Sequence, residues 1–186
     1  MGGSEMKVVF VASINGKKEQ KFFYLSIIGI LKTLGHEVFY KHVINENSDS
    51  INKSNQKNIT FHKNIIKKIK NADFIVSEIT HESISVGYLI HEALTNSKPV
   101  ICLSRLDTVP NMSIFLENYK KFIFVPYKKI FELEKNLPKI ILDLPIEKQK
   151  KLNFLIDEKL DEKLKKVADE KGLTKSDLLR NFVENL

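Results

Sequence analysis

The sequence predicts an α/β protein, with a doubly wound, five-stranded parallel sheet covered by helices on both faces and a small unit at the C-terminus. Short apolar runs alternate with segments of helical periodicity from residue 7 to residue 142, which favours parallel strands joined by helices. A hydrophobic content of 42% is sufficient for such a core, and 186 residues leave room for one ordinary domain and an appendage. We expect domains at 6–142 and 151–186, with a linker over 143–150.

The first two strands and the first helix are expected near the N-terminus. Residues 7–13 form an apolar strand, and a helix with apolar positions through 23–34 ends at Gly35. The pattern at 37–43 predicts a second strand. Residues 44–58 are rich in Asn and Ser and have no periodicity, so we expect a mobile excursion there rather than a regular element.

The rest of the domain continues the alternation of strand and helix. The expected elements, in chain order, are a helix over 61–71, a central strand over 74–79, a strand over 99–103, a short helix over 112–118, a strand over 121–125, and a closing helix over 127–142 that is interrupted at Pro138.

The stretch from Asp73 to Leu94 organises this domain, because a buried strand there gives way to a polar turn over 80–87 and then to a helix. In an open α/β sheet the loop at the carboxyl end of a strand borders the ligand crevice, and the following helix presents free N–H groups to anions. Ser83, Ser85 and Gly87 are therefore predicted to cradle a phosphate. The alternative is an ordinary strand-to-helix connection.

Cysteine usage and hydropathy indicate a soluble, cytoplasmic protein. The single cysteine, Cys102, lies in an apolar run, so we expect a buried, inert thiol and a reducing compartment. We see no secretory signal pattern and no apolar run near the ~20 residues that span a bilayer, so no membrane partner is expected. We expect no metal and no cofactor.

The formal net charge of +7 is unevenly distributed along the chain. Residues 143–186 contain ten basic and ten acidic side chains, so the whole surplus lies in the first 142 residues. The lysines at 63, 67, 68 and 70 could form a basic helix face or an ordinary solvated one.

Several short sequence motifs occur in order over residues 7–131: ASING at 12–16, KHV at 41–43, NADFIVSEIT at 71–80, SISVGY at 83–88, KPVICL at 98–103 and MSI at 112–114. Tyr24 lies on the first expected helix. With these motifs, residues 7–131 resemble the nucleoside 2-deoxyribosyltransferase superfamily, and within it most closely the 2'-deoxynucleoside 5'-monophosphate N-glycosidases.

The resemblance implies a site for a (deoxy)nucleoside monophosphate or a related nucleotide, and assembly into a homodimer or a higher homo-oligomer. Matching residues would meet the nucleotide in the first loop (Ser13, Ile14, Gly16), hold the 5'-phosphate (Ser83, Gly87), line the sugar and base pocket (Tyr24, His42), and reach into the site of a neighbouring subunit (Met112, Ser113). Tyr24 could instead only pack in the core, and His42 could be an ordinary surface or core histidine.

The sequence departs from the family at both catalytic carboxylates. The family glutamate that acts at the anomeric carbon corresponds to Leu89, and a second carboxylate corresponds to Ile65. An aliphatic side chain cannot stabilise or trap positive charge of the oxocarbenium type. We therefore name no catalytic residue with confidence in this sequence. Glu92 and Glu82 are the candidate substitutes, and their alternative is to be solvated acids on a helix and a loop.

The C-terminal unit has a pattern of its own. We expect a short strand over 152–156, Asp157 as an N-cap, and a helix that ends at Gly172. A second helix follows, with Thr174 as its cap. Strand, helix, turn and helix in so short a segment resemble the ribbon-helix-helix family of dimeric DNA-binding modules, whose strands pair across the dimer because the unit cannot bury a core alone.

By this resemblance the module would contact duplex DNA. Lys151, Asn153 and Leu155 would face outward from the strand, and Thr174 and Lys175 would begin the helix that holds a phosphate. Lys151 and Asn153 suit such contacts and Leu155 does not. Because the tail has no net charge, a unit that serves dimerisation alone is the alternative.

Two functions of different classes follow from this sequence. The first is a dimeric, nucleotide-binding pseudoenzyme fused to a DNA-binding module, acting as a ligand-responsive regulator or as a component of a defence or toxin–antitoxin system. The second is an active N-glycosidase or deoxyribosyltransferase that uses an unrecognised acid, with the tail serving assembly.

Overall fold

The computed structural model describes residues 5–46, 55–107, 119–146 and 155–184. The chain divides into two compact units, residues 1–147 and 148–186, and the division falls within the segment predicted as a linker. The short helix predicted at 112–118 lies outside the described residues.

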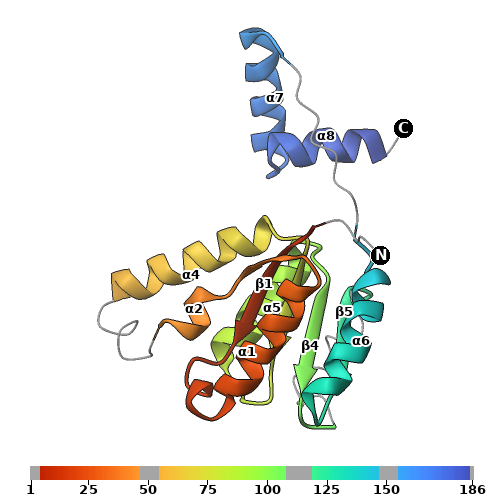
Figure 1. Cartoon of the computed structure of the whole chain (residues 1–186). Coiled ribbons are helices and arrows are strands. Elements are labelled where there is room, and N and C mark those ends of the chain that lie inside the picture. The colour runs from red at the N-terminus through yellow and green to blue at the C-terminus, as the bar shows by residue number, and fades with distance from the viewer. Residues whose placement is uncertain (1–4, 47–54, 108–118, 147–154, 185–186) are drawn as a thin grey trace. The chain divides into compact units, whose positions relative to one another are not determined.

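The first unit is built on a five-stranded parallel sheet with strand order β2-β1-β3-β4-β5 (Figure 1). The strands are β1 (Lys7–Ala12), β2 (Glu37–Phe39), β3 (Phe74–Glu78), β4 (Val100–Ser104) and β5 (Phe122–Pro126). All four neighbouring pairs are parallel, and β3 lies at the centre with every residue buried. The predicted five-stranded parallel sheet is confirmed.

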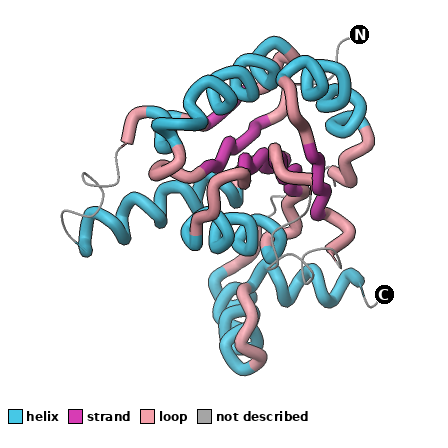
Figure 2. The backbone as a smooth tube through the Cα atoms, turned by 90° about the horizontal axis from the view of Figure 1, so that it is seen from below, coloured by secondary structure: helices cyan, strands magenta, loops and turns pink. Residues whose placement is uncertain are grey.

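Helices cover both faces of the sheet, as the sequence predicts (Figures 1 and 2). The helices are α1 (Lys17–Thr33), α2 (Lys41–Ile44), α4 (Asn55–Lys70), α5 (Ile84–Thr95) and α6 (Ile130–Leu142). Because strand side chains alternate between faces, Val8 and Phe10 pack against α1 and α6, whereas Val9 and Val11 pack against α4 and α5. The sheet therefore separates two apolar cores.

Two predicted segments near the second strand differ from the structure. Strand β2 ends at Phe39, and Lys41–Ile44 form the helical turn α2, which buries Val43 in the core beside α1. The predicted excursion was too long, since α4 already begins at Asn55. The first residues of α4 are polar and show no helical spacing of apolar side chains, so the sequence pattern does not reveal them. The buried Ile65 and Ile69 stabilise the helix further along.

Two further helices also differ from the prediction, one at its start and one in its interior. Helix α5 begins at Ile84, inside the segment expected to be a turn, because Ser83 provides an N-cap. Helix α6 continues through Pro138 without a break. Leu137 and Ile141 on either side of this proline are buried in the core, and this packing maintains the helix despite the missing N–H donor.

The second unit contains α7 (Glu158–Glu170) and α8 (Lys175–Glu184). Asp157 caps α7 by accepting a hydrogen bond from the Leu160 N–H at 2.8 Å, and Gly172 follows the helix with a φ of +63°. Thr174 caps α8, because its Oγ1 accepts from the Asp177 N–H at 3.1 Å. Residues 152–154 of the predicted strand lie outside the described residues.

Two glycines of α1 give a matched test of backbone conformation. Gly35 ends the helix with a φ of +86°, which L-residues adopt at a cost of about 1–2 kcal/mol. Gly29 is exposed in the middle of the helix, and a Cβ there would meet no atom within 4 Å. We expect Gly35→Ala to lower the free energy of unfolding by about 1 kcal/mol and Gly29→Ala to raise it by a similar amount. Urea denaturation measures both. Equal effects of the two substitutions would contradict this account.

Candidate functional site

A cavity of about 150 Å³ opens at the carboxyl edge of the sheet. Parallel strands end together at this edge, so their loops and the following helices converge there. The lining comes from β1 and its loop (Val11, Ala12, Ser13, Ile14, Asn15), from α2 (His42), from α4 (Asn58, Phe61, His62, Ile65) and from α5 and its cap (Ser83, Ser85, Val86, Leu89).

Several residues proposed from the sequence meet at this cavity. Those that line it are Ser13, Ile14, His42, Ser83 and Ser85, whereas Gly16, Tyr24 and Gly87 are absent from its lining and Met112 and Ser113 lie outside the described residues. Sequence reasoning missed Asn15, Asn58, Phe61 and His62. Phe61 and His62 lie one turn before Ile65 on α4, and this helical spacing was the available signal.

The loop after β1, residues 13–16, is held by hydrogen bonds and by close packing. The Tyr24 hydroxyl, fully buried on α1, donates to the Ser13 carbonyl at 3.2 Å, and the Gly16 N–H donates to Ser13 Oγ at 3.3 Å. Burial raises the pKa of the Tyr24 phenol, which keeps this donor protonated. A Cβ on Gly16 would lie 2.6 Å from Cβ and Cγ of His81, so only glycine fits there without movement. Tyr24 and Gly16 therefore position the loop rather than line the cavity.

The N-terminus of α5 borders the cavity and has the features that suit an anion. Ser83 Oγ accepts from the Val86 N–H at 3.5 Å, and the Ser83 carbonyl accepts from the Gly87 N–H at 3.0 Å. The helix dipole places partial positive charge here, beside the hydroxyls of Ser83 and Ser85. Gly87 lies within the first turn, where its N–H is already used by the helix.

The floor of the cavity is apolar where the family resemblance requires carboxylates. Ile65 is 2% exposed on α4, Leu89 is 4% exposed on α5, and both line the cavity. Among the residues that the structure describes, the lining contains neither aspartate nor glutamate. Glu82 is exposed, and Glu92 lies beside Tyr88, whose pKa it raises through a side-chain hydrogen bond. Neither candidate substitute lines the cavity.

A neutral histidine forms one wall. His42 is 8% exposed and stacks on Phe39, with ring centroids 4.9 Å apart and an interplanar angle of 12°. Burial lowers the pKa of His42 to about 4, so the ring is uncharged at pH 7. Within the described residues neither ring nitrogen has a hydrogen-bond partner. A neutral imidazole offers one donor and one acceptor, and among the described residues both are buried and unsatisfied.

Glu78 lies at the same edge but on the other face of the sheet. This carboxyl is fully buried, and its Oε1 accepts hydrogen bonds from the Tyr127 hydroxyl at 3.2 Å and from the Thr80 hydroxyl. Burial raises the pKa of Glu78, although these two hydrogen bonds oppose the rise. Thr80 Oγ1 also accepts from the Arg105 N–H at 2.9 Å. Glu78 therefore ties the ends of β3, β4 and β5 together and does not line the cavity.

The cavity suits a ligand with an anionic group and an apolar or aromatic body. The features that suit such a ligand are the helix dipole and hydroxyls at the α5 N-terminus, the neutral imidazole, the aromatic ring and the apolar floor. The fold belongs to the doubly wound α/β class, and its candidate site lies at the carboxyl edge of the sheet.

Comparison with known proteins narrows this class. No protein-family model matches the chain. A protein of Nematostella vectensis, provisionally named 2'-deoxynucleoside 5'-phosphate N-hydrolase 1, is 29% identical over 142 residues, which cover 74% of this chain and 92% of that protein. The 5-hydroxymethyl-dUMP N-hydrolase of Rattus norvegicus is 30% identical over 99 residues, which cover 53% of this chain and 60% of the rat enzyme.

Solved structures give the same fold. A 2-deoxyribosyltransferase from Bacillus psychrosaccharolyticus matches with a TM-score of 0.56 at 18% identity, over 76% of this chain and 98% of that one. A CMP N-glycosidase from Clostridium botulinum matches with a TM-score of 0.51 at 20% identity, over 71% and 98%. Sequence relatives and fold together support a place for the α/β domain in the superfamily of nucleoside deoxyribosyltransferases and nucleotide N-hydrolases.

Within the described ranges, the helices are all too short or too polar to cross a membrane.

The buried His42 predicts acid sensitivity. Its pKa is lower in the folded state, about 4, than the ordinary value of 6.5, so the unfolded state binds more protons between these pH values. The contribution of His42 to the free energy of unfolding is therefore complete above pH 6.5 and falls by about 3 kcal/mol as the pH drops to 4. We expect His42→Phe to lose this dependence in urea titrations at pH 7, 5.5 and 4. The exposed His91→Phe is the control, and parallel behaviour of the two variants would contradict the assignment.

Proposed function

We propose that the α/β domain binds a 2'-deoxynucleoside 5'-monophosphate or a related nucleotide in its cavity without cleaving the N-glycosidic bond. We further propose that residues 151–186 form a ribbon-helix-helix unit that dimerises the chain and contacts duplex DNA. The protein is then a nucleotide-responsive regulator or a component of a defence or toxin–antitoxin system.

The apolar floor carries the first proposal. Ile65 and Leu89 line the cavity from two different helices, at the two positions where the family resemblance places catalytic carboxylates. The transition state of N-glycoside cleavage develops positive charge on the sugar, and an aliphatic wall offers that charge no stabilisation. Loss of one such charge-stabilising group costs about 3–4 kcal/mol of barrier, or roughly 10²–10³ in rate, and here two are absent.

The remaining features support retained nucleotide binding. The α5 N-terminus with Ser83 and Ser85 suits a 5'-phosphate, because free N–H groups and the helix dipole favour an anion. Phe61 also lines the cavity and offers a ring on which a base can stack, and His42 adds a neutral imidazole to the lining. The named relatives are N-hydrolases of deoxynucleoside 5'-phosphates, which supports the same ligand class here.

The alternative is an active glycosidase that uses another acid. It requires Glu82 or Glu92 to reach the sugar, although both side chains lie outside the lining of the cavity.

Exposed apolar side chains in the second unit support dimerisation. Among its described residues only Ala168 is buried, while Phe182 and Val183 are 65% and 66% exposed and Leu155 is fully exposed. A unit of this size needs a second copy to bury such surface. Pairing of two copies satisfies this requirement.

The DNA-contacting residues rest on the resemblance. Lys151 and Asn153 lie outside the described residues. Thr174 begins α8 and caps it, and Lys175 Nζ forms an ion pair with Asp161 Oδ1 at 2.6 Å. The cap thus uses the Asp177 N–H, which leaves the N–H groups of Lys175 and Ser176 in the first turn of α8 for a phosphate, and the Lys175 side chain is directed to α7.

The first functional test measures base release and binding on one preparation. We expect no free base from any of the four common deoxynucleoside monophosphates by chromatography, together with measurable binding by calorimetry. Ser83→Ala should weaken binding about tenfold, because it removes a hydroxyl that contacts a charged group. Ser176→Ala, in the other unit, is the matched control.

Two further sets of variants test which residues are responsible for base release or for its absence. Turnover by the unmodified protein that disappears in Glu92→Gln or Glu82→Gln would overturn the pseudoenzyme proposal. Base release gained by the double variant Leu89→Glu, Ile65→Asp would show directly that the apolar floor is what silences the site.

The second functional test concerns assembly. We expect the double substitution Phe182→Ser, Val183→Ser to weaken the homodimer by at least tenfold in sedimentation velocity, because each apolar side chain lost from an interface costs about 2 kcal/mol. Phe22→Ser is the control, since Phe22 on α1 is also exposed, at 67%. A dimer unaffected by the tail substitutions would assign assembly to the α/β domain.

A further inference from the structure

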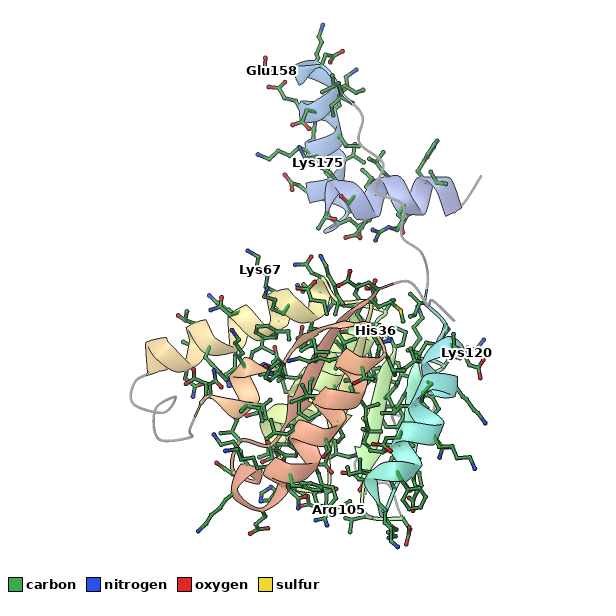
Figure 3. All side chains as sticks on the ribbon, in the orientation of Figure 1. His36, Lys67, Arg105, Lys120, Glu158 and Lys175 are labelled. Carbon is green, nitrogen blue, oxygen red and sulfur yellow. The ribbon has the colours of Figure 1, made fainter. Side chains whose placement is uncertain are left out.

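A set of lysines in the α/β domain lies away from the cavity, at the amino edge of the sheet. Because the strands are parallel, their first residues lie at one edge, and the helices that run back also end there. Lysines at this edge are Lys7 at the start of β1, Lys67 and Lys70 in the last turn of α4, Lys98 before β4, and Lys120 and Lys121 before β5. Lys67 and Lys120 are both labelled at this edge in Figure 3, and Arg105 lies at the opposite one.

Helix α4 extends this basic surface along one side. Residues 55–70 include no aspartate or glutamate, and Lys63, Lys67 and Lys70 are exposed at the i, i+4, i+7 spacing of one helix face. This row spans about 10 Å at 1.5 Å per residue. One strand of a nucleic-acid duplex places a phosphate every ~3.4 Å along its axis, so the row matches about three phosphates.

The two edges of the sheet differ in charge balance. Acids near the amino edge include Asp73, which accepts a hydrogen bond from the backbone N–H of Lys7 at 2.6 Å, and Glu37. At the carboxyl edge Lys128 has an acidic partner, since its Nζ lies 2.9 Å from Asp107 Oδ2. Lysines near helix C-termini also favour the helix dipole, yet that role does not require so many at one edge.

Of the polyanions that could cover this surface, a duplex fits the structure better than a membrane does. A helix that binds a bilayer inserts its apolar face, but Ile65 and Ile69 of α4 are buried in the domain core. What α4 presents outward is charge on a rigid scaffold, which suits phosphate contacts of the sequence-independent kind.

We propose that the amino edge of the sheet and the outer row of α4 bind the phosphate backbone of duplex DNA. This inference rests on the DNA-binding part of the proposed function and assigns to the α/β domain the cationic contacts that the neutral tail lacks. By this proposal the tail selects the DNA sequence, and the α/β domain contributes the salt-dependent part of the affinity.

The test uses the full chain and a fluorescent duplex, with affinity measured between 50 and 200 mM salt. We expect Lys67→Gln, Lys70→Gln, Lys120→Gln together to reduce the slope of log affinity against log salt by about 2.7, which is about 0.9 for each lost phosphate contact. Between 50 and 200 mM salt, the unmodified protein should therefore lose about 40-fold more affinity than the triple lysine variant loses. The control is Lys21→Gln, Lys129→Gln, Lys135→Gln, which removes three exposed lysines elsewhere in the domain and should leave the slope unchanged.

Two additional arms separate the outcomes. Asn153→Ala removes no charge, so it should alter the preferred DNA sequence without altering the salt slope. If Asn153→Ala leaves the sequence preference unchanged while the lysine variant has a smaller slope, the inference holds and the proposed DNA contact of the tail is wrong. An unchanged slope in the lysine variant overturns the inference and leaves the tail proposal intact. Binding of anionic phosphatidylserine vesicles by the unmodified protein without duplex binding overturns both.

Discussion

Burial of β3 on both faces is the constraint on which the rest of the domain depends. Its five side chains have no contact with solvent, so the chain must place helices on each side of the sheet and keep neighbouring strands on each edge. Those helices begin at the carboxyl edge beside the strand ends, and this brings the first turns of α4 and α5 close enough to enclose a cavity. The binding site is thus a consequence of covering an apolar strand, and its chemistry is decided by whichever side chains the two helices direct inward.

The parts of this architecture set by local pattern were predictable from the sequence. Apolar runs identify the five strands, Gly35 and Gly172 mark helix ends through positive φ, and Asp157 and Thr174 mark helix starts through capping. The errors arose where tertiary packing prevails over local preference. Val43 is extended by propensity but turns into α2 to reach the core, and Pro138 stays within α6 because its neighbours are buried.

The same division applies to the cavity. Ser13, Ser83 and Leu89 were found from the words that surround them, since strand ends and helix caps are visible in one dimension. Asn58 was missed because α4 was expected to begin after it. The unpartnered nitrogens of His42 could not be predicted either, because burial and stacking on Phe39 result from the whole fold. The sequence indicates which elements meet, and packing determines which polar atoms are left without partners.

The close approach of Gly16 to His81 has a consequence for how this site can vary. The loop after β1 and the loop after β3 touch at a point where an added methyl group would lie 2.6 Å from the imidazole. Cβ of His81 is itself one of the atoms at 2.6 Å, so position 16 can accept a larger residue without movement only if position 81 becomes glycine; a larger residue at position 16 alone would push the two loops apart. In a set of related sequences the two positions should vary together, and the width of the cavity between their loops would follow that pair.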